Sequence, residues 1–203
     1  MGRPSPAFGG GGRRLKTMIK RNYEYKFGVE VSIGDGKFLI RHKLIGQAEP
    51  KDYEDFPLPH YVYEVAVRRV DIPSDEYRFI YHGSFNDLKK GKKRLSEIDL
   101  VLAFRMTLED ALAFADHWNV DDFARDYGID KPSKAIKLWK TCQNIYEDVR
   151  EKLKLTYSDI HDIVDTLIEW ENEDFKSDKV DIKTLWGEVY SKRFSELSKG
   201  VKK

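Results

Sequence analysis

The hydrophobic pattern of the chain changes its period close to residue 107. Before this point short runs of β-branched and aromatic residues alternate with polar ones, and after it apolar residues recur every three to four positions. The first period is that of half-buried strands and the second that of amphipathic helices. Strands that all precede the helices indicate α+β and exclude a wound parallel sheet. We therefore predict an N-terminal antiparallel sheet of four or five strands followed by a C-terminal bundle of four to five helices.

Four segments of the first half have the composition of strands and are arranged as two hairpins. Asp35-Gly36 supplies the residue types of a type I′ turn, which predicts the first hairpin. A Pro-Ser-Asp turn at residues 73–75 predicts the second. The predicted strands cover residues 25–33, 37–46, 60–70 and 76–84.

The second half contains residues that start and end helices. Thr107 opens a capping-box type start, Gly128 is an expected C-cap, and Pro132 stands where a first-turn proline is tolerated. Residues 99–106 fit a fifth strand or a short helix, and we favour the strand. The predicted helices cover residues 107–118, 120–128, 133–153, 156–171 and 181–198.

Composition and charge suggest three parts. Residues 1–20 are rich in Gly, Pro and Arg and are predicted to be a disordered basic arm, residues 21–153 an α+β domain, and residues 154–203 a helical extension packed on it or projecting from it. The formal net charge is +1, but residues 1–46 carry +7 and residues 147–178 carry −7. Such asymmetry concerns partners rather than the fold.

No motif for chemistry emerges from the sequence. The five histidines lack the spacing of a paired-histidine metal site, and the single cysteine, Cys142, lies on an apolar helical stripe typical of core. We predict no metal, no cofactor and no enzymatic activity. The chain has no apolar run of the roughly 18 residues that span a bilayer and no apolar signal segment, so we expect a cytoplasmic protein that does not bind membranes.

Two charged surfaces are candidates for binding. A basic loop cluster, predicted to contact nucleic acid together with the N-terminal arm, consists of Lys89, Lys90, Lys92, Lys93 and Arg94. An acidic ridge, predicted to bind a basic partner, consists of Asp159, Asp162, Asp165 and Glu169 at three-and-four spacing on the helix of residues 156–171.

Residues 107–153 resemble a family of small phage- and prophage-encoded proteins of uncharacterised function. The resemblance departs from the family pattern at Ala124, Ile129 and Lys131-Pro132. The matching positions are Asp122, Phe123, Tyr127, Gly128, Asp130, Ser133, Lys134 and Ala135.

The resemblance implies a corner between two helices. Gly128 would permit its turn, Asp130 or Ser133 would cap the next helix, and Phe123, Tyr127 and Trp139 would anchor it to the sheet. The pattern is superficially that of a DNA-reading helix-turn-helix, but the next helix carries few Arg, Asn or Gln outward, which argues against base readout.

Two functions follow from these features. The first is an accessory protein of a phage or mobile element that binds a host or defence-system protein without chemistry, for example an anti-CRISPR or other anti-defence inhibitor whose acidic ridge mimics nucleic acid. The alternative is direct nucleic-acid binding through the basic loop cluster and the arm.

Overall fold

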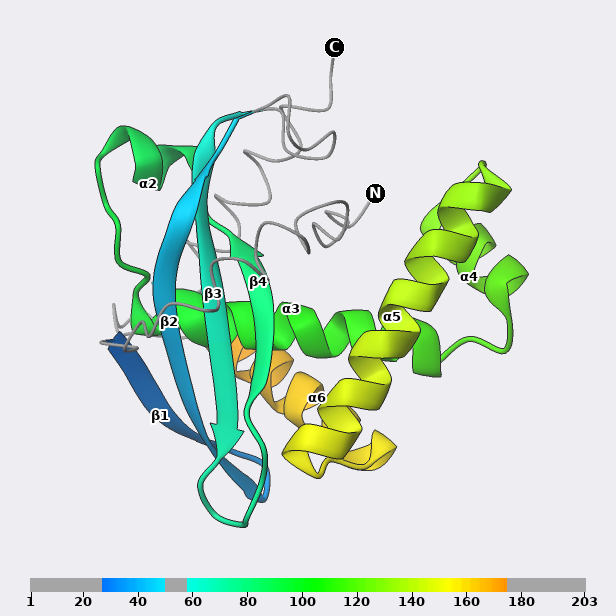
Figure 1. Ribbon diagram of the computed structural model, residues 1–203. Coiled ribbons are helices and arrows are strands. Elements are labelled where there is room, and N and C mark those ends of the chain that lie inside the picture. Colours follow the sequence, from blue (N-terminus) through cyan, green and yellow to red (C-terminus); the bar gives the residue numbers. More distant parts are fainter. Residues whose placement is uncertain (1–26, 50–57, 175–203) are drawn as a thin grey trace.

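The structure, a computed structural model, describes residues 27–49 and 58–174. Four antiparallel strands form one sheet in the order β1-β2-β3-β4, and helices cover one of its faces (Figure 1). The predicted α+β class is thereby confirmed, with four strands and not five. The strands are β1 (Phe27–Ile33), β2 (Gly36–Ala48), β3 (His60–Arg69) and β4 (Tyr77–His82). The helices are α2 (Phe85–Lys89), α3 (Glu97–Ala115), α4 (Val120–Tyr127), α5 (Pro132–Leu153) and α6 (Tyr157–Asp174).

The first hairpin forms as predicted, but its turn lies one residue earlier. Ile33 pairs with Gly36, so the two residues between the strands are Gly34 and Asp35. Gly34 has φ +57, which a residue with a side chain adopts only at a cost. Among the described non-glycine residues only Lys154 has a positive φ, so Asp35 does not, and positive φ at the first central residue alone indicates a type II′ turn rather than the type I′ turn that we expected.

Residues 99–106 belong to α3, so the predicted fifth strand is wrong. The helix starts at Ser96, whose hydroxyl accepts the backbone N–H of Asp99 at 3.1 Å in a capping box. Thr107, expected to start a helix, lies inside α3 and donates its hydroxyl to the Ala103 carbonyl at 3.0 Å. The five consecutive residues from Leu100 to Phe104 are all buried, which explains why the segment has no helical period.

Helix α3 is the centre of the main core. It packs against the sheet on one side and against α5 and α6 on the other (Figure 1). Phe104 meets Phe38 of β2 with ring centroids 5.3 Å apart, and α6 contributes Ile160 and Leu167 to the same cluster. Each such fully buried side chain stabilises the fold by roughly 1.5–3 kcal/mol relative to an exposed one. The described part of the predicted 154–203 extension therefore shares the main core.

The opposite face of the sheet also contains buried groups. Glu64 of β3 is only 2% exposed and pairs with Lys43 of β2 at 3.0 Å. Nearby, His60 Nε2 and His82 Nδ1 are 2.6 Å apart, and both residues are buried. This histidine pair joins the start of β3 to the end of β4. Two positive charges this close together would repel each other, so the two rings are not both protonated.

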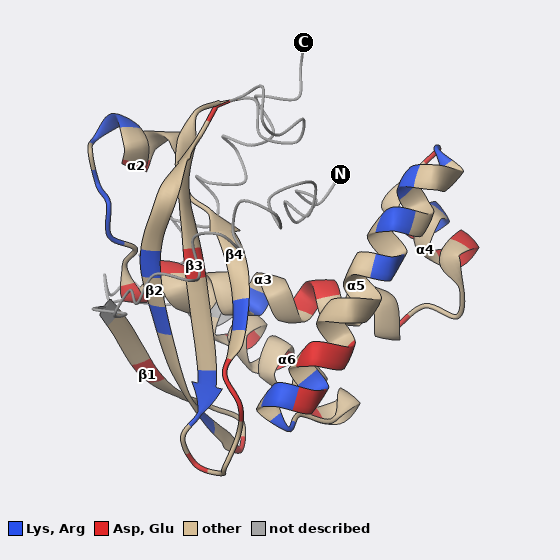
Figure 2. Cartoon of the chain, in the orientation of Figure 1, with Lys and Arg blue, Asp and Glu red and all other residues tan. Residues whose placement is uncertain are grey.

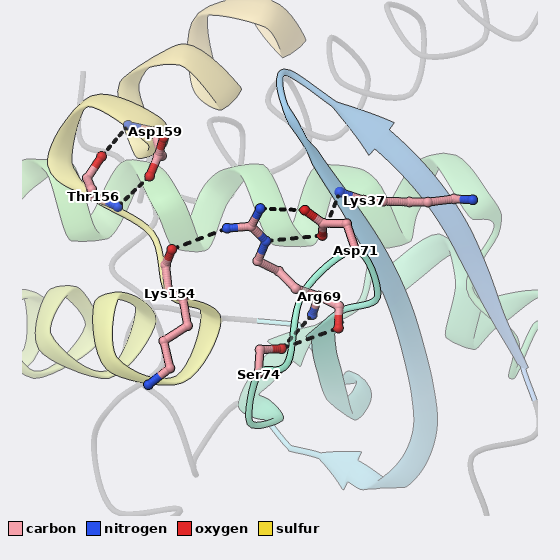
Figure 3. Close-up of polar contacts among 7 residues, drawn as sticks. All are labelled: Lys37, Arg69, Asp71, Ser74, Lys154, Thr156 and Asp159. Carbon is pink, nitrogen blue, oxygen red and sulfur yellow. Dashed lines mark hydrogen bonds and ion pairs between the residues drawn. The ribbon is translucent and has the colours of Figure 1, made fainter.

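A further polar link joins the sheet to the helices. Arg69 at the end of β3 forms an ion pair with Asp71 and donates to the Lys154 carbonyl at 3.2 Å (Figure 3). The hydrogen bonds from Arg69 lower the pKa of Asp71 to about 2. Lys154 is the C-cap of α5 and has a left-handed φ of 53, which strains a residue with a side chain. The hydrogen bond from Arg69 therefore falls on the strained turn between α5 and α6. The predicted arm at residues 1–20 and the predicted helix at 181–198 lie outside the described residues.

Candidate functional site

Helices α4 and α5 form a helix-turn-helix corner. Asn119 caps α4, its side-chain oxygen accepting the backbone N–H of Asp121 at 3.0 Å and of Asp122 at 2.9 Å. Gly128 ends α4 with φ +64, the left-handed C-cap predicted from the sequence. Residues 128–131 form the turn, and Pro132 is the first residue of α5. Lys131 is the N-cap and makes no side-chain cap bond, so the expected cap by Asp130 or Ser133 is wrong.

A second, smaller core holds this corner together. Its buried members are Ala113 of α3, Phe123 of α4 and Cys142 of α5. Trp139 packs on Phe123 and on Phe114, with ring centroids 5.4 and 4.7 Å apart. These aromatic residues anchor the corner to α3 and not to the sheet, contrary to our expectation.

His117 adds polar contacts to the same corner. Its Nδ1 lies 2.6 Å from the carbonyl oxygen of Ala113, and its Nε2 lies 2.9 Å from a carboxylate oxygen of Asp126. Its ring also faces Tyr127 with centroids 5.5 Å apart. These contacts fix α4 to the end of α3. The corner that carries α5 is therefore anchored to the rest of the helices. This end of the molecule extends away from the sheet (Figure 1).

The first half of α5 exposes a row of lysines, which we call the α5 basic face. Residues 131–140 contain four lysines and no acidic residue, and all four lysines are exposed. Figure 2 shows them as the blue turns at the outer end of α5. In the described part of the chain none of them forms an ion pair. The α5 basic face consists of Lys131, Lys134, Lys137 and Lys140.

The neighbouring helix α4 has the opposite charge. Asp121 and Asp126 are exposed, and Arg125 forms an ion pair with Asp122 at 2.7 Å. The α3–α4 loop also places Trp118 at the surface with 93% of its area exposed. The cationic surface of the corner is therefore restricted to α5.

The basic loop cluster predicted from the sequence is exposed as expected. It begins with Lys89, the last residue of α2, and continues into the loop that follows. The loop is held against the sheet because the Leu95 N–H donates to His42 Nε2 at 3.0 Å and the Tyr63 hydroxyl donates to the Lys92 carbonyl at 3.5 Å. Figure 2 shows this loop and the α5 basic face at opposite sides of the molecule. The two sets of cations therefore do not form one surface.

The acidic ridge on α6 has three exposed members. Asp162, Asp165 and Glu169 are exposed on one side of the helix. The fourth, Asp159, is half-buried and accepts the Thr156 backbone N–H at 2.7 Å, while Thr156 Oγ1 accepts the Asp159 N–H at 3.1 Å (Figure 3). Asp159 is therefore engaged in capping α6, which begins where the sequence predicts.

One further polar cluster joins α3 to α6. Asp116 Oδ1 accepts the Tyr157 hydroxyl at 2.6 Å and lies 2.8 Å from His161 Nε2. The hydrogen bond to Asp116 raises the pKa of Tyr157. Among residues 27–49 and 58–174, no three His, Cys, Asp or Glu side chains are placed to hold a metal ion. We read this cluster as a link between two helices.

No family model, curated protein or solved structure matches the chain. The resemblance to phage-encoded proteins therefore stays a prediction. No helix in the described ranges is both long enough and apolar enough to cross a membrane.

The sequence contained the signal for the α5 basic face, although our sequence reasoning passed over it. Lysines recur at every third position from Lys131 to Lys140 with no acid between them. The same segment carries the apolar stripe with Ala135 and Leu138, and the segment was interpreted from that stripe as a core helix. A helix has two faces, and only the buried one was interpreted.

Proposed function

We propose that the protein binds nucleic acid through the α5 basic face, whose lysines contact backbone phosphates. The observation that carries the proposal is the exposed, acid-free row of four lysines on a helix that is anchored by the corner beneath it. Phosphate contacts from lysine supply most of the affinity in non-specific nucleic-acid binding. The sequence suggested this function but placed it on the basic loop cluster.

The number of lysines sets the expected strength and salt dependence. Three to four phosphate contacts on a duplex predict a slope of log K against log salt of about −3, because each contact contributes roughly −0.9. Binding should therefore be clear at low ionic strength and fall steeply as salt is added. A binder of this kind needs no strongly basic overall composition, since the charge that matters is local.

Charge reversal tests the proposal with a matched control. One variant carries Lys134→Glu, Lys137→Glu and Lys140→Glu, and the control carries Lys89→Glu, Lys90→Glu and Lys93→Glu, so both change the net charge equally. Fluorescence anisotropy with a labelled 20-base-pair duplex at low salt measures binding, and circular dichroism checks the fold. We expect the α5 variant to lose binding and the loop variant to retain most of it. The reverse order would place the function on the basic loop cluster.

The acidic ridge supports a second candidate function, binding of a basic host or defence-system protein. Asp162, Asp165 and Glu169 are exposed and form no ion pair with a described residue. Replacing all three with lysine should abolish capture of such a partner from nuclease-treated host lysate and leave the fold intact, because exposed charges contribute little to stability. Capture unchanged by the replacements would remove this candidate.

A further inference from the structure

The outward side of α5 carries a polar stripe that extends the basic face. Ser133, Lys137, Lys140 and Asn144 are all exposed and follow one another at spacings of four, three and four residues. At 3.6 residues per turn they lie within about 60° of each other around the helix axis. Ala135, Cys142 and Ile145 point to the opposite, buried side. Lys134 lies beside the stripe, about 60° around the helix axis from Lys137, and Lys131 is the N-cap residue that precedes the helix.

From these positions we infer that the nucleic acid is double-stranded DNA and that α5 enters its major groove with this stripe. The inference rests on the proposed function and specifies its ligand. An α-helix with its side chains is about 10–12 Å across and fits the major groove of B-DNA, which is about 12 Å wide. The stripe is about 16 Å long, by 1.5 Å per residue, enough to cross that groove.

The distribution of charge along α5 agrees with this placement. The exposed acids Glu147 and Glu151 follow the stripe and limit favourable contact to the first half of the helix. Helix-turn-helix proteins likewise use the N-terminal part of the second helix in the groove. Exposed Asp121 on α4 disfavours phosphate contact there, so α5 carries the contact alone.

Other nucleic acids fit this surface less well. Single-strand binders stack bases on aromatic side chains, whereas the stripe has none. Phe123 and Trp139 pack on one another, and the exposed Trp118 belongs to the α3–α4 loop and not to α5. Duplex RNA has a deep, narrow major groove that does not admit a helix. Asn144 is the only amide in the stripe and can pair with adenine, so contacts with base edges are few, as the sequence indicated, and the lysines act mainly on phosphates.

Three labelled probes of 20 nucleotides per strand test the inference on the full chain: duplex DNA, duplex RNA of the same sequence, and one DNA strand. At equal low salt, duplex DNA should bind about tenfold more tightly than either alternative. Methyl green, which occupies the major groove, should displace the protein, and netropsin, which occupies the minor groove, should not. Tighter or equal binding of RNA or single strand, or displacement by netropsin alone, would overturn the inference and leave the proposed function standing.

Paired variants locate the contact within α5. Lys137→Ala with Lys140→Ala removes two charges from the stripe, and Lys131→Ala with Lys134→Ala removes two from its flank. The stripe variant should weaken duplex DNA binding several-fold more than the flank variant, and Asn144→Ala should weaken it while leaving the salt slope unchanged. Equal loss in both double variants would overturn insertion of the stripe. No binding of wild type to any probe would overturn the proposed function itself.

Discussion

Acid should weaken the fold through the buried histidine pair. His60 Nδ1 lies 2.8 Å from the carbonyl oxygen of Leu58, so it donates there and leaves Nε2 to accept the Nδ1–H of His82. Burial, and then the proximity of His60, lower the pKa of His82 to about 3 from an ordinary value near 6.5. Protons then bind the unfolded chain in preference to the folded one. The contribution of neutral His82 to the free energy of unfolding is therefore fully present above pH 6.5 and is lost as the pH falls toward 3.

The size of this effect follows from the shift. Between pH 6.5 and 5.0 the folded His82 stays neutral while the unfolded one gains a proton, which costs about 1.4 kcal/mol per pH unit and about 2 kcal/mol in total. Urea denaturation at pH 7.5 and 5.0 measures the change. The His82→Asn variant, whose amide N–H replaces Nδ1–H, serves as reference because titratable groups outside the histidine pair then cancel. A wild type that loses no more stability than this variant would refute the reasoning.

The remaining predictions concern the corner and the α6 cap. Gly128→Ala should cost about 1 kcal/mol by urea denaturation, because an open position with φ +64 strains a side chain, whereas Gly46→Ala, also open, should cost little. Cys142 is 3% exposed, so it should react with thiol reagents only on denaturation, and Cys142→Ser should cost about 1–3 kcal/mol. Thr156→Ala should cost about 1 kcal/mol through loss of the α6 cap.

The sheet was predictable because its strands follow local rules. Alternation in β3 and a glycine-containing turn between β1 and β2 both depend on residues close in sequence. Helix α3 was not predictable at its first half, because burial on both sides removes the helical period that identifies a helix. Leu100 to Phe104 therefore resemble a strand until their neighbours in space are known.

The candidate surfaces were predictable only as exposed charge. The sequence correctly places Lys89 and Asp162 at the surface. It does not show which row of charged residues lies on a helix that is anchored by a core. The α5 basic face is held in place by contacts between residues far apart in sequence, such as Phe114 with Trp139, whose ring centroids are 4.7 Å apart. Asp159 shows the converse, because its capping role reduces its availability for a partner.

The most direct test of the central claim is to find which residues contact nucleic acid. Titration of isotope-labelled protein with a short DNA duplex, followed by amide chemical shifts in nuclear magnetic resonance, reports the contact for each residue. Our account predicts that the largest changes fall between residues 131 and 144 on α5 and disappear when salt is raised. Largest changes at residues 89–94, or on α6, would contradict the account.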